Sequence, residues 1–336
     1  MTSRRAVLGG MASGLVMAGL PARAFSRSVA PGPLSLVDPE MRAGLAGHQT
    51  LDFTAALLPS VRRPPARVAP PLAERMLPGL PGQPPVRTVQ FDGAPGRKGR
   101  GALVWIHGGG FVSGTAGINA GLQRLAAEKG WLVVSVEYRL APEARIEASL
   151  ADNYAALRWV HDNADALGVD RRRIAAGGSS AGGGHAAMLA LAARDRREVP
   201  LAYQVLIYPM LDDRTGSTRP ARPGTGDFIW TAASNRFGWT SLLGVPAGEA
   251  KVPARTVPGR RSDLAGLPPA FVGVGTLDLF LDEDIAYAGA LAAAGVPVDL
   301  AVVPGAYHSF DGIAAQSQAS RAFTGRWMAD LAAALG

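Results

Sequence analysis

The feature of this sequence that most constrains its fold is a repeated alternation between short apolar runs and longer stretches with helical periodicity. The apolar runs cover residues 102–107, 131–138, 173–178, 203–210, 271–276 and 298–303. The helical stretches cover residues 148–167, 181–195 and 282–295. Short, continuously apolar runs are typical of strands that are buried on both faces, and strands that alternate with helices usually pair in parallel. The sequence therefore predicts an α/β fold with a mostly parallel central sheet flanked by helices.

Two regions interrupt this alternation. Residues 25–85 and, with approximate bounds, residues 212–262 are rich in proline and glycine, which break regular elements. Long insertions of this kind often form a lid over a site, and we expect the two segments to form two parts of one helical cap. The main α/β domain is then predicted over residues 86–336, with the second cap segment inside it. A chain of 336 residues with 48% hydrophobic content is long enough for such a domain and an added lobe.

The first residues resemble a twin-arginine export signal. Arg4 and Arg5 precede a weakly apolar stretch over residues 6–20, and residues 22–24 read ARA, the small-x-small pattern of a cleavage site. The apolar stretch is shorter than the ~20 residues that span a membrane. We therefore predict a signal peptide over residues 1–24 and an exported, periplasmic protein that meets the membrane only during export. The alternatives are an amphipathic start and a segment that is kept as a membrane anchor.

Charge and composition exclude several classes of function. The formal net charge is +7, but the basic residues are scattered and form no long run, so no nucleic-acid partner is expected. The absence of cysteine excludes disulfides, thiolate catalysis and cysteine-bound metals. No group of histidines and carboxylates has the spacing of metal ligands, so neither a metal nor a cofactor is expected. Nothing in the sequence indicates an oligomeric state.

A glycine-rich turn lies where the run at 173–178 meets the helical stretch at 181–195. Residues 178–182 read GSSAG and fit the pattern G-x-S-x-G, in which Ser180 is centred between the glycines. A serine on a sharp strand-to-helix turn needs strained backbone angles and small neighbours, and the helix start directs free N–H groups to the site. Ser180 is therefore a candidate nucleophile. A phosphate-binding turn is disfavoured because G-x-G-x-x-G and G-K-[ST] are absent, whereas a plain structural turn remains an alternative on this pattern alone.

Residues that follow three other apolar runs complete a candidate catalytic site. His107 precedes three glycines, residues 108–110, whose backbone N–H groups can face an oxyanion, and His107 itself is interpreted as a ring that steadies this loop. Asp278 follows the run at 271–276, and His308 follows the last run. The order Ser, Asp, His along the chain is typical of α/β-hydrolases. All three residues follow predicted strands, at the sheet edge where open α/β folds place their sites.

Other acids and histidines compete for these two roles. Asp282 and Asp284 lie near Asp278, but they start the next helix, where acidic residues serve as caps and dipole partners. The remaining histidines are His48 in the predicted cap, and His161 and His185 on predicted helices. His185 closely follows the serine turn, yet a helix holds it away from the loops that could bring a base to the hydroxyl. We therefore favour Asp278 and His308.

Five motifs together carry a family resemblance. They are HGGGF at 107–111, YRLAPE at 138–143, GSSAGG at 178–183, TLDLFLDED at 276–284 and YHSF at 307–310. The combination resembles the hormone-sensitive lipase family of α/β-hydrolases, over roughly residues 86–336. Two features depart from the family's pattern: Ser179 stands where the family usually has aspartate, and residues 145–148 replace an aromatic and proline-bearing continuation.

The resemblance implies a site and an activity. Ser180 is implied as the nucleophile, His308 as the base and Asp278 as the acid that orients it. The implied oxyanion hole consists of the backbone amides of Gly109, Gly110 and Ala181, and the implied structural residues are Tyr138 and Glu143. The implied function is a serine carboxylesterase that hydrolyses small to medium carboxylic esters through an acyl-enzyme intermediate. We call Ser180, His308 and Asp278 the triad. The alternatives are an acyltransferase or peptidase that uses the same triad, and a non-enzymatic ligand-binding protein on this fold.

Several aromatic residues near the cap and the catalytic loops have two interpretations. Phe111, Trp230 and Phe310, together with Phe228 and Trp239, either line an apolar substrate pocket or pack in the core. The sequence leaves both interpretations open.

Overall fold

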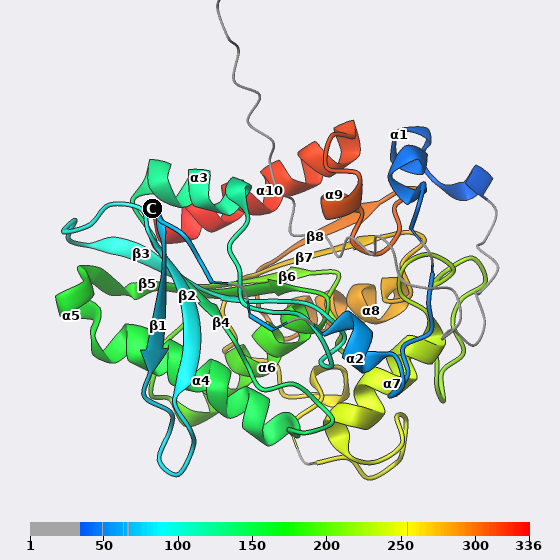
Figure 1. Cartoon of the computed structure of the whole chain (residues 1–336), viewed down its shortest axis with the longest axis horizontal. Coiled ribbons are helices and arrows are strands. Elements are labelled where there is room, and N and C mark those ends of the chain that lie inside the picture. The colour runs from blue at the N-terminus through cyan, green and yellow to red at the C-terminus, as the bar shows by residue number, and fades with distance from the viewer. Residues whose placement is uncertain (1–33, 49, 63, 66, 254) are drawn as a thin grey trace, which may run out of the picture.

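The structure, a computed structural model, describes residues 34–48, 50–62, 64–65, 67–253 and 255–336, and its centre is an eight-stranded sheet (Figure 1). The strands are β1 (Leu72–Leu77), β2 (Val86–Asp92), β3 (Arg100–Ile106), β4 (Leu132–Val136), β5 (Val169–Ser179), β6 (Tyr203–Ile207), β7 (Ala270–Gly275) and β8 (Val298–Val303). Their order across the sheet is β1-β2-β4-β3-β5-β6-β7-β8. Strand β2 runs antiparallel to β1 and β4, and the other pairs are parallel. The predicted mostly parallel sheet is confirmed.

The six apolar runs predicted as strands all lie in this sheet, as β3 to β8. Strand β3 shows why they are apolar throughout. Leu103 and Trp105 pack on one face of the sheet, in a buried cluster that also contains Trp327. Val104 and Ile106 pack on the other face, in a second buried cluster. Because successive side chains of a strand point to opposite faces, a strand covered on both sides needs an apolar residue at every position.

Helices cover both faces of the sheet. They are α1 (Pro39–Arg42), α2 (Leu58–Val61), α3 (Ala120–Lys129), α4 (Ile146–Asp162), α5 (Ala164–Leu167), α6 (Ala181–Arg196), α7 (Ala232–Leu243), α8 (Leu281–Ala293), α9 (Phe310–Ile313) and α10 (Gln318–Leu335), with the 3-10 helices η1 (Leu34–Leu36), η2 (Ala43–Leu45) and η3 (Pro258–Arg260). Helices α3 and α10 lie on one face, and α4, α6 and α8 lie on the other (Figure 1). The helical stretches predicted from periodicity correspond to α4 with α5, to α6 and to α8.

The segment predicted as the first cap part, residues 25–85, also supplies a strand. Strand β1 pairs with β2 from Leu72, opposite Phe91, to Leu77, opposite Val86. Residues 73–76 of this edge strand are exposed, so β1 lacks the apolar run that marks the buried strands. Prolines and glycines in the connection to β2 further obscure the pairing in the sequence. Residues 72–77 therefore belong to the sheet.

The two predicted cap parts contact each other directly. Asp52 accepts a hydrogen bond of 2.6 Å from Thr231, and the backbone N–H of Phe53 donates to Ser234 Oγ at 2.9 Å. Apolar residues of α2 and α7 join one buried cluster. The cluster also contains Phe111, which directly follows the three glycines at 108–110; we call residues 107–113 the triglycine loop. The cluster also contains Ile146 of α4 and Met188 of α6, so the cap shares a buried core with the α/β domain.

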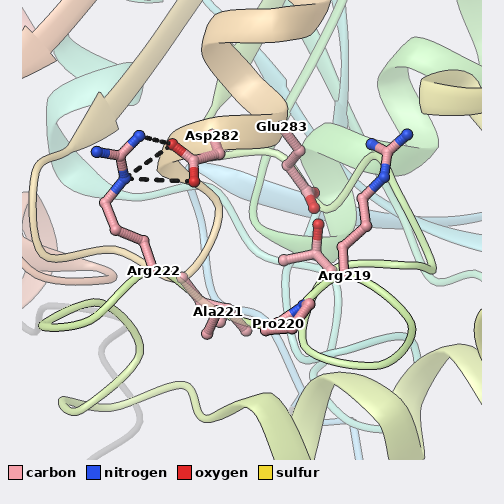
Figure 2. Close-up of a pocket in the computed structure, with 8 residues that line it drawn as sticks. Arg219, Pro220, Ala221, Arg222, Asp282 and Glu283 are labelled. Carbon is pink, nitrogen blue, oxygen red and sulfur yellow. Dashed lines mark hydrogen bonds and ion pairs between the residues drawn. The ribbon is translucent and has the colours of Figure 1, made fainter.

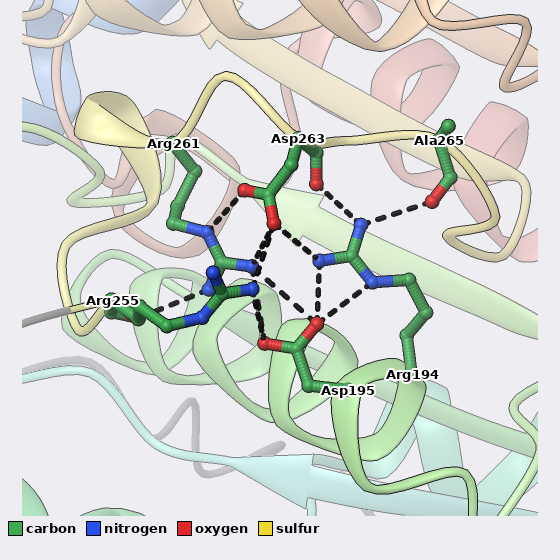
Figure 3. Close-up of polar contacts among 6 residues, drawn as sticks. All are labelled: Arg194, Asp195, Arg255, Arg261, Asp263 and Ala265. Atoms are coloured by element: carbon green, nitrogen blue, oxygen red, sulfur yellow. Dashed lines mark hydrogen bonds and ion pairs between the residues drawn. The ribbon is translucent and has the colours of Figure 1, made fainter.

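A network of arginines and aspartates fastens the end of the second cap segment to α6 (Figure 3). Asp195 on α6 and Asp263 beyond η3 each accept hydrogen bonds from Arg194, Arg255 and Arg261. Because α6 begins at the candidate serine turn, the network connects the base of the cap to the helix that follows this turn.

Residues 1–24, predicted as an export signal, lie outside the described residues. Within the residues that the structure describes, no helix is both long enough and apolar enough to cross a membrane.

Candidate active site

Ser180 occupies a strained turn between β5 and α6. Its φ is +57° and its ψ is −124°, a left-handed conformation that is uncommon for residues other than glycine. The glycines on either side permit the turn: a β-carbon on Gly178 would lie 2.4 Å from the carbonyl oxygen of Ile106, and one on Gly182 would lie 2.1 Å from the same oxygen. The sequence pattern G-x-S-x-G thus reflects the close approach of the end of β3 to this turn.

Ser180, His308 and Asp278 form a continuous chain of hydrogen bonds. His308 Nε2 lies 2.9 Å from Ser180 Oγ, and His308 Nδ1 lies 2.8 Å from Asp278 Oδ2. The other carboxylate oxygen of Asp278 accepts the N–H of Phe280 at 3.0 Å, which fixes the orientation of the acid. The three side chains follow β5, β8 and β7 at the carboxyl edge of the sheet, as expected, and all three residues are buried.

Aromatic rings enclose the imidazole of His308. The ring centroids of Tyr208 and Phe280 lie 4.8 and 5.3 Å from that of His308, both in edge-to-face orientation. The Trp230 ring lies 6.4 Å away on the cap. Because these rings exclude water, the charges and hydrogen bonds of the triad act in a surrounding of low dielectric constant.

The triglycine loop lies against the serine turn and has an unusual backbone. Gly109, Gly110 and Phe111 all have positive φ, at 119°, 61° and 68°. A β-carbon on Gly108 would lie 3.3 Å from Ser180 Cβ, which shows how closely the loop approaches the turn. This conformation turns the peptide groups of the loop and determines where their N–H groups point.

The carbonyl oxygens that precede Gly109 and Gly110 are both held by hydrogen bonds. His107 Nδ1 donates to the Gly108 oxygen at 2.8 Å. The Gly109 oxygen accepts three bonds from residues 112–113: the two backbone N–H groups at 3.1 and 2.9 Å, and Ser113 Oγ at 2.9 Å. In a trans peptide the C=O and N–H point in opposite directions, so bonds that hold these oxygens also fix the direction of the Gly109 and Gly110 N–H groups.

The same arrangement orients the amide of Ala181. The carbonyl oxygen of Ser180 accepts the N–H groups of Gly184 and Met210, each at 3.0 Å, and the Ala181 N–H therefore points the other way. Among the described residues, the N–H groups of Gly109, Gly110 and Ala181 have no hydrogen-bond acceptor. These are the three free donors that the resemblance implied for an oxyanion hole.

His107 and His185 are buried neutral rings. Burial lowers the pKa of His107 to about 4, and its ring stacks on Tyr138 with a centroid separation of 4.3 Å. Burial also lowers the pKa of His185 to about 3, and its Nε2 lies 2.9 Å from Ser149 Oγ. His107 thus steadies the glycine loop, as interpreted from the sequence. Neither ring contacts the Ser180 hydroxyl, which bonds to His308.

Among the described residues, the acids that follow Asp278 form no hydrogen bond with His308. Asp282 pairs directly with Arg222, and both residues line a cavity of about 110 Å³ together with Glu283 (Figure 2). Glu283 also accepts the backbone N–H of Leu211 at 2.7 Å. Asp284 is fully buried, and neither of its carboxylate oxygens has a hydrogen-bond partner among the described residues. Asp278 is therefore the acid that the fold brings to the imidazole.

The three aromatic residues considered for substrate binding occupy different places. Trp230 lies at the site, between Gly110 and the His308 ring. Phe111 is fully buried against Trp239 and His185, and Phe310 is fully buried against Tyr208 and Phe323. Direct contact of Phe111, Trp230 and Phe310 with a substrate stays a prediction.

Sequence reasoning missed a tyrosine that contacts His308. The Tyr208 hydroxyl donates to Asp311 Oδ1 at 2.7 Å, and its ring packs on His308. The apolar run at 203–210 predicts a strand along its whole length, whereas β6 ends at Ile207 and Tyr208 begins the loop at the sheet edge. The proline that follows Tyr208 is the signal that marks this end. Within the described residues, no group of three or more His, Asp or Glu side chains could hold a metal ion.

Comparisons with known proteins agree with this geometry. The family model described as alpha/beta hydrolase fold matches residues 103–312. Esterase LipI of Mycobacterium tuberculosis is 36% identical over 236 residues, which cover 68% of this chain and 71% of LipI. Carboxylesterase NlhH of the same organism is 33% identical over 262 residues, which cover 74% of this chain and 82% of NlhH.

The structure also resembles solved structures. It superposes on a bacterial heroin esterase with a TM-score of 0.76 and 34% sequence identity, over 90% of this chain and 99% of the other. The family model spans more than half of the chain, and the relatives named above are esterases. The chain therefore belongs to the α/β-hydrolase family, in its hormone-sensitive lipase-like branch.

Proposed function

We propose that this chain is a serine carboxylesterase, that Ser180, His308 and Asp278 are its catalytic residues, and that small to medium carboxylic esters are its substrates. The observation that carries the proposal is the hydrogen-bond chain from Ser180 Oγ through His308 to Asp278, beside three free backbone N–H groups. Relatives that are named esterase or carboxylesterase support the same activity.

The geometry supports acylation of Ser180 in the first half-reaction. His308 Nε2 takes the hydroxyl proton as Oγ attacks the ester carbonyl carbon, and the carbonyl oxygen becomes an oxyanion. The N–H groups of Gly109, Gly110 and Ala181 donate to this oxygen, which carries full charge only in the tetrahedral intermediate. When the intermediate collapses, the bond to the alcohol oxygen breaks and His308 Nε2 returns the proton to this oxygen. The products are an acyl-enzyme and a free alcohol.

Deacylation repeats these steps with water. His308 Nε2 takes a proton from the water as its oxygen attacks the acyl carbon, and then returns a proton to Ser180 Oγ as the acid leaves. Asp278 keeps the proton of the neutral imidazole on Nδ1 and stabilises the imidazolium that forms in each half-reaction. Nε2 is therefore free to accept a proton at the start of each half-reaction.

Ester hydrolysis is tested by comparing neighbouring serine variants. Protein from residue 25 onward is assayed on p-nitrophenyl esters from acetate to palmitate, with Ser180→Ala and its matched control Ser179→Ala. We expect turnover of the shorter esters by the wild type and by Ser179→Ala, and none by Ser180→Ala. Turnover by Ser180→Ala would reject Ser180 as the nucleophile. If the wild type hydrolyses no ester and a fluorophosphonate fails to label Ser180, the proposed function is rejected.

We also propose that residues 1–24 direct export through a twin-arginine pathway into the periplasm. The support is the order of Arg4 and Arg5, an apolar stretch and the ARA cleavage pattern. Replacing both arginines by lysine should leave the esterase in the cytoplasm of a bacterial host, whereas the unaltered chain should reach the periplasm in processed form. Equal periplasmic activity from the two chains would overturn this proposal.

A further inference from the structure

Arg62 connects the first cap segment to the loop that carries the oxyanion glycines. It follows α2, and its side chain is largely buried. Its Nε donates to the carbonyl oxygen of Val112 at 2.7 Å, and one of its terminal nitrogens donates to the carbonyl oxygen of Ala141. The same guanidinium forms a bidentate pair with Glu143, at 2.8 and 2.9 Å. One side chain from the cap thus joins two segments of the α/β domain.

The bonds of Arg62 lie next to the strained part of the glycine loop. Phe111 has a φ of +68°, and its carbonyl oxygen accepts the N–H of Ala141 at 3.0 Å. Arg62 holds the next carbonyl along the loop, that of Val112, together with the carbonyl of Ala141 itself. A residue other than glycine keeps a left-handed conformation only where its surroundings impose it, and these bonds are part of those surroundings.

Val112 also contributes to the oxyanion hole through its N–H. This group donates to the carbonyl oxygen of Gly109, one of the contacts that fix the direction of the Gly110 N–H. If the peptide groups of Val112 move, the Gly109 carbonyl moves with them, and the Gly110 N–H changes direction. Packing supports the same link, because Leu57, Leu58 and Val61 lie in one buried cluster with Phe111 and Val112.

The Glu143 carboxylate explains how the guanidinium keeps its orientation. The hydrogen bond from Arg62 lowers the pKa of Glu143, so Glu143 is ionised at neutral pH. Glu143 is itself well exposed, and the attraction within an exposed ion pair contributes little to stability. Its importance here is geometric, because a bidentate carboxylate fixes the plane of the guanidinium. Lysine could not replace this fork of donors.

We propose that Arg62 is a positioning residue for the oxyanion hole, so that docking of the first cap segment sets the loop in its catalytic shape. This inference rests on the proposed ester hydrolysis. Arg62 touches neither the triad nor the three oxyanion amides, and it acts through Val112 and Ala141. The expected signature is a loss of kcat with little change in KM, because the contacts it supports form only when the oxyanion develops.

The test compares Arg62→Gln and Arg62→Lys with Arg326→Gln. Arg326 of α10 is a matched control. It too forms a bidentate pair with a carboxylate, that of Asp299, and donates to a backbone carbonyl, that of Leu300 on β8. For each variant we would measure kcat and KM on a short-chain p-nitrophenyl ester. Burst titration would count the active sites, and inhibition by an aryl trifluoromethyl ketone would report on the oxyanion hole directly. Thermal unfolding would report on the fold.

Both Arg62 variants should lose kcat by roughly 10- to 100-fold per titrated site, with KM within about twofold of the wild type. Affinity for the trifluoromethyl ketone, whose hemiketal oxygen mimics the oxyanion, should fall by a similar factor. A few tens of millimolar guanidinium, but not equimolar sodium chloride, should partly restore the kcat of an Arg62→Ala variant. Arg326→Gln should match the wild type.

Two other outcomes would overturn the inference. If the loss of activity in Arg62→Gln equals the loss of titrated sites, Arg62 only stabilises the fold. If kcat and inhibitor affinity match those of Arg326→Gln, Arg62 has no influence on the oxyanion hole. In both cases the wild type and Ser179→Ala remain active, so failure of this inference is distinguishable from failure of the proposed function, in which the wild type itself is inactive.

Discussion

Trp230 lies so close to Gly110 that a β-carbon added to this glycine would come within 2.1 Å of the indole ring. Gly110 also has a φ of +61°, which a residue with a side chain rarely adopts. Trp230 of the cap and the triglycine loop are therefore fitted to each other, and both this contact and the positive φ require a glycine at position 110.

Gly110→Ala should consequently abolish most activity. Either the loop or Trp230 must move, and loss of one oxyanion donor typically lowers kcat by about 10²–10³. The measurement is kcat on a short-chain ester, with tryptophan fluorescence as a report on Trp230. Gly325→Ala on α10 is the control, because its β-carbon would meet open space and alanine favours a helix. Wild-type kcat in Gly110→Ala would contradict the fitted arrangement.

Asp278→Asn should retain the fold and lose catalysis. The amide oxygen can still accept the Phe280 N–H, but the amide carries no charge for the imidazolium and no longer enforces the tautomer of His308. Loss of this function in serine triads lowers kcat by roughly 10⁴. Asp282→Asn, which removes only an exposed pair with Arg222, should keep wild-type kcat. Equal activity of the two variants in a p-nitrophenyl acetate assay would exclude Asp278 from the triad.

Asp284→Ala should stabilise the protein at alkaline pH. Burial raises the pKa of Asp284 well above its ordinary value, and the negative charges of Glu283 and Asp278 add to the effect. The folded state therefore holds the proton more tightly than the unfolded state, whose pKa is about 3.9, and stability falls as pH rises above that value.

The measurement for Asp284→Ala is the free energy of unfolding in denaturant between pH 5 and pH 8.5. The variant should exceed the wild type by about 1–3 kcal/mol at the upper end, because an unpaired buried carboxyl is removed. The difference should shrink toward pH 5. Asp282→Ala, at an exposed position, is the control. A variant that is less stable than the wild type at pH 8.5 would show that Asp284 has a partner that supports it.

Asp263→Asn should weaken the network between the cap and α6 at neutral pH but not in acid. The hydrogen bond from Arg261 lowers the pKa of Asp263 well below its ordinary value, although burial opposes the shift. The stabilisation is thus complete above the unfolded pKa of about 3.9 and is lost as pH falls through the lower folded pKa.

Thermal unfolding of Asp263→Asn and the wild type at pH 7 and in the acid range would measure this loss. The difference in Tm should be present at pH 7, should narrow below about pH 4, and should also narrow in 1 M salt, which screens exposed charges. Asp165→Asn, which breaks an isolated exposed pair with Arg171, provides the comparison. A difference in Tm that grows toward low pH would contradict a lowered pKa for Asp263 in the folded state.

The sequence predicted which side chains meet at the candidate site where these side chains follow buried strands. Ser180, Asp278 and His308 were identifiable because each follows an apolar run, and the carboxyl ends of parallel strands meet at one edge of the sheet. The turn glycines were identifiable because their close contacts exclude a side chain. Strand β1 was missed because an exposed edge strand has no continuous apolar run.

The contacts from the cap could not be predicted in the same way. Arg62 is one of many scattered arginines, and its partners lie 50 and 79 residues away in the sequence, on elements whose approach depends on the whole fold. Tyr208 is hidden inside an apolar run that continues past the end of its strand. Such residues make contacts between elements that are far apart in the sequence, and neither periodicity nor motif spacing predicts those contacts.

The division of the cap into two parts has a consequence for the order in which the molecule folds. The hydrogen bond between Asp52 and Thr231 joins residues 179 positions apart, with most of the sheet between them in the chain. Contacts of such long sequence separation form late, after more local pairings have shortened the effective loop. Trp230, which precedes Thr231 and lies against His308, is thus positioned only after the sheet has formed. In a denaturant titration, the contact between the two cap segments should also be the first to open. Turnover should then disappear while the far-UV circular dichroism of the sheet and its helices is still intact.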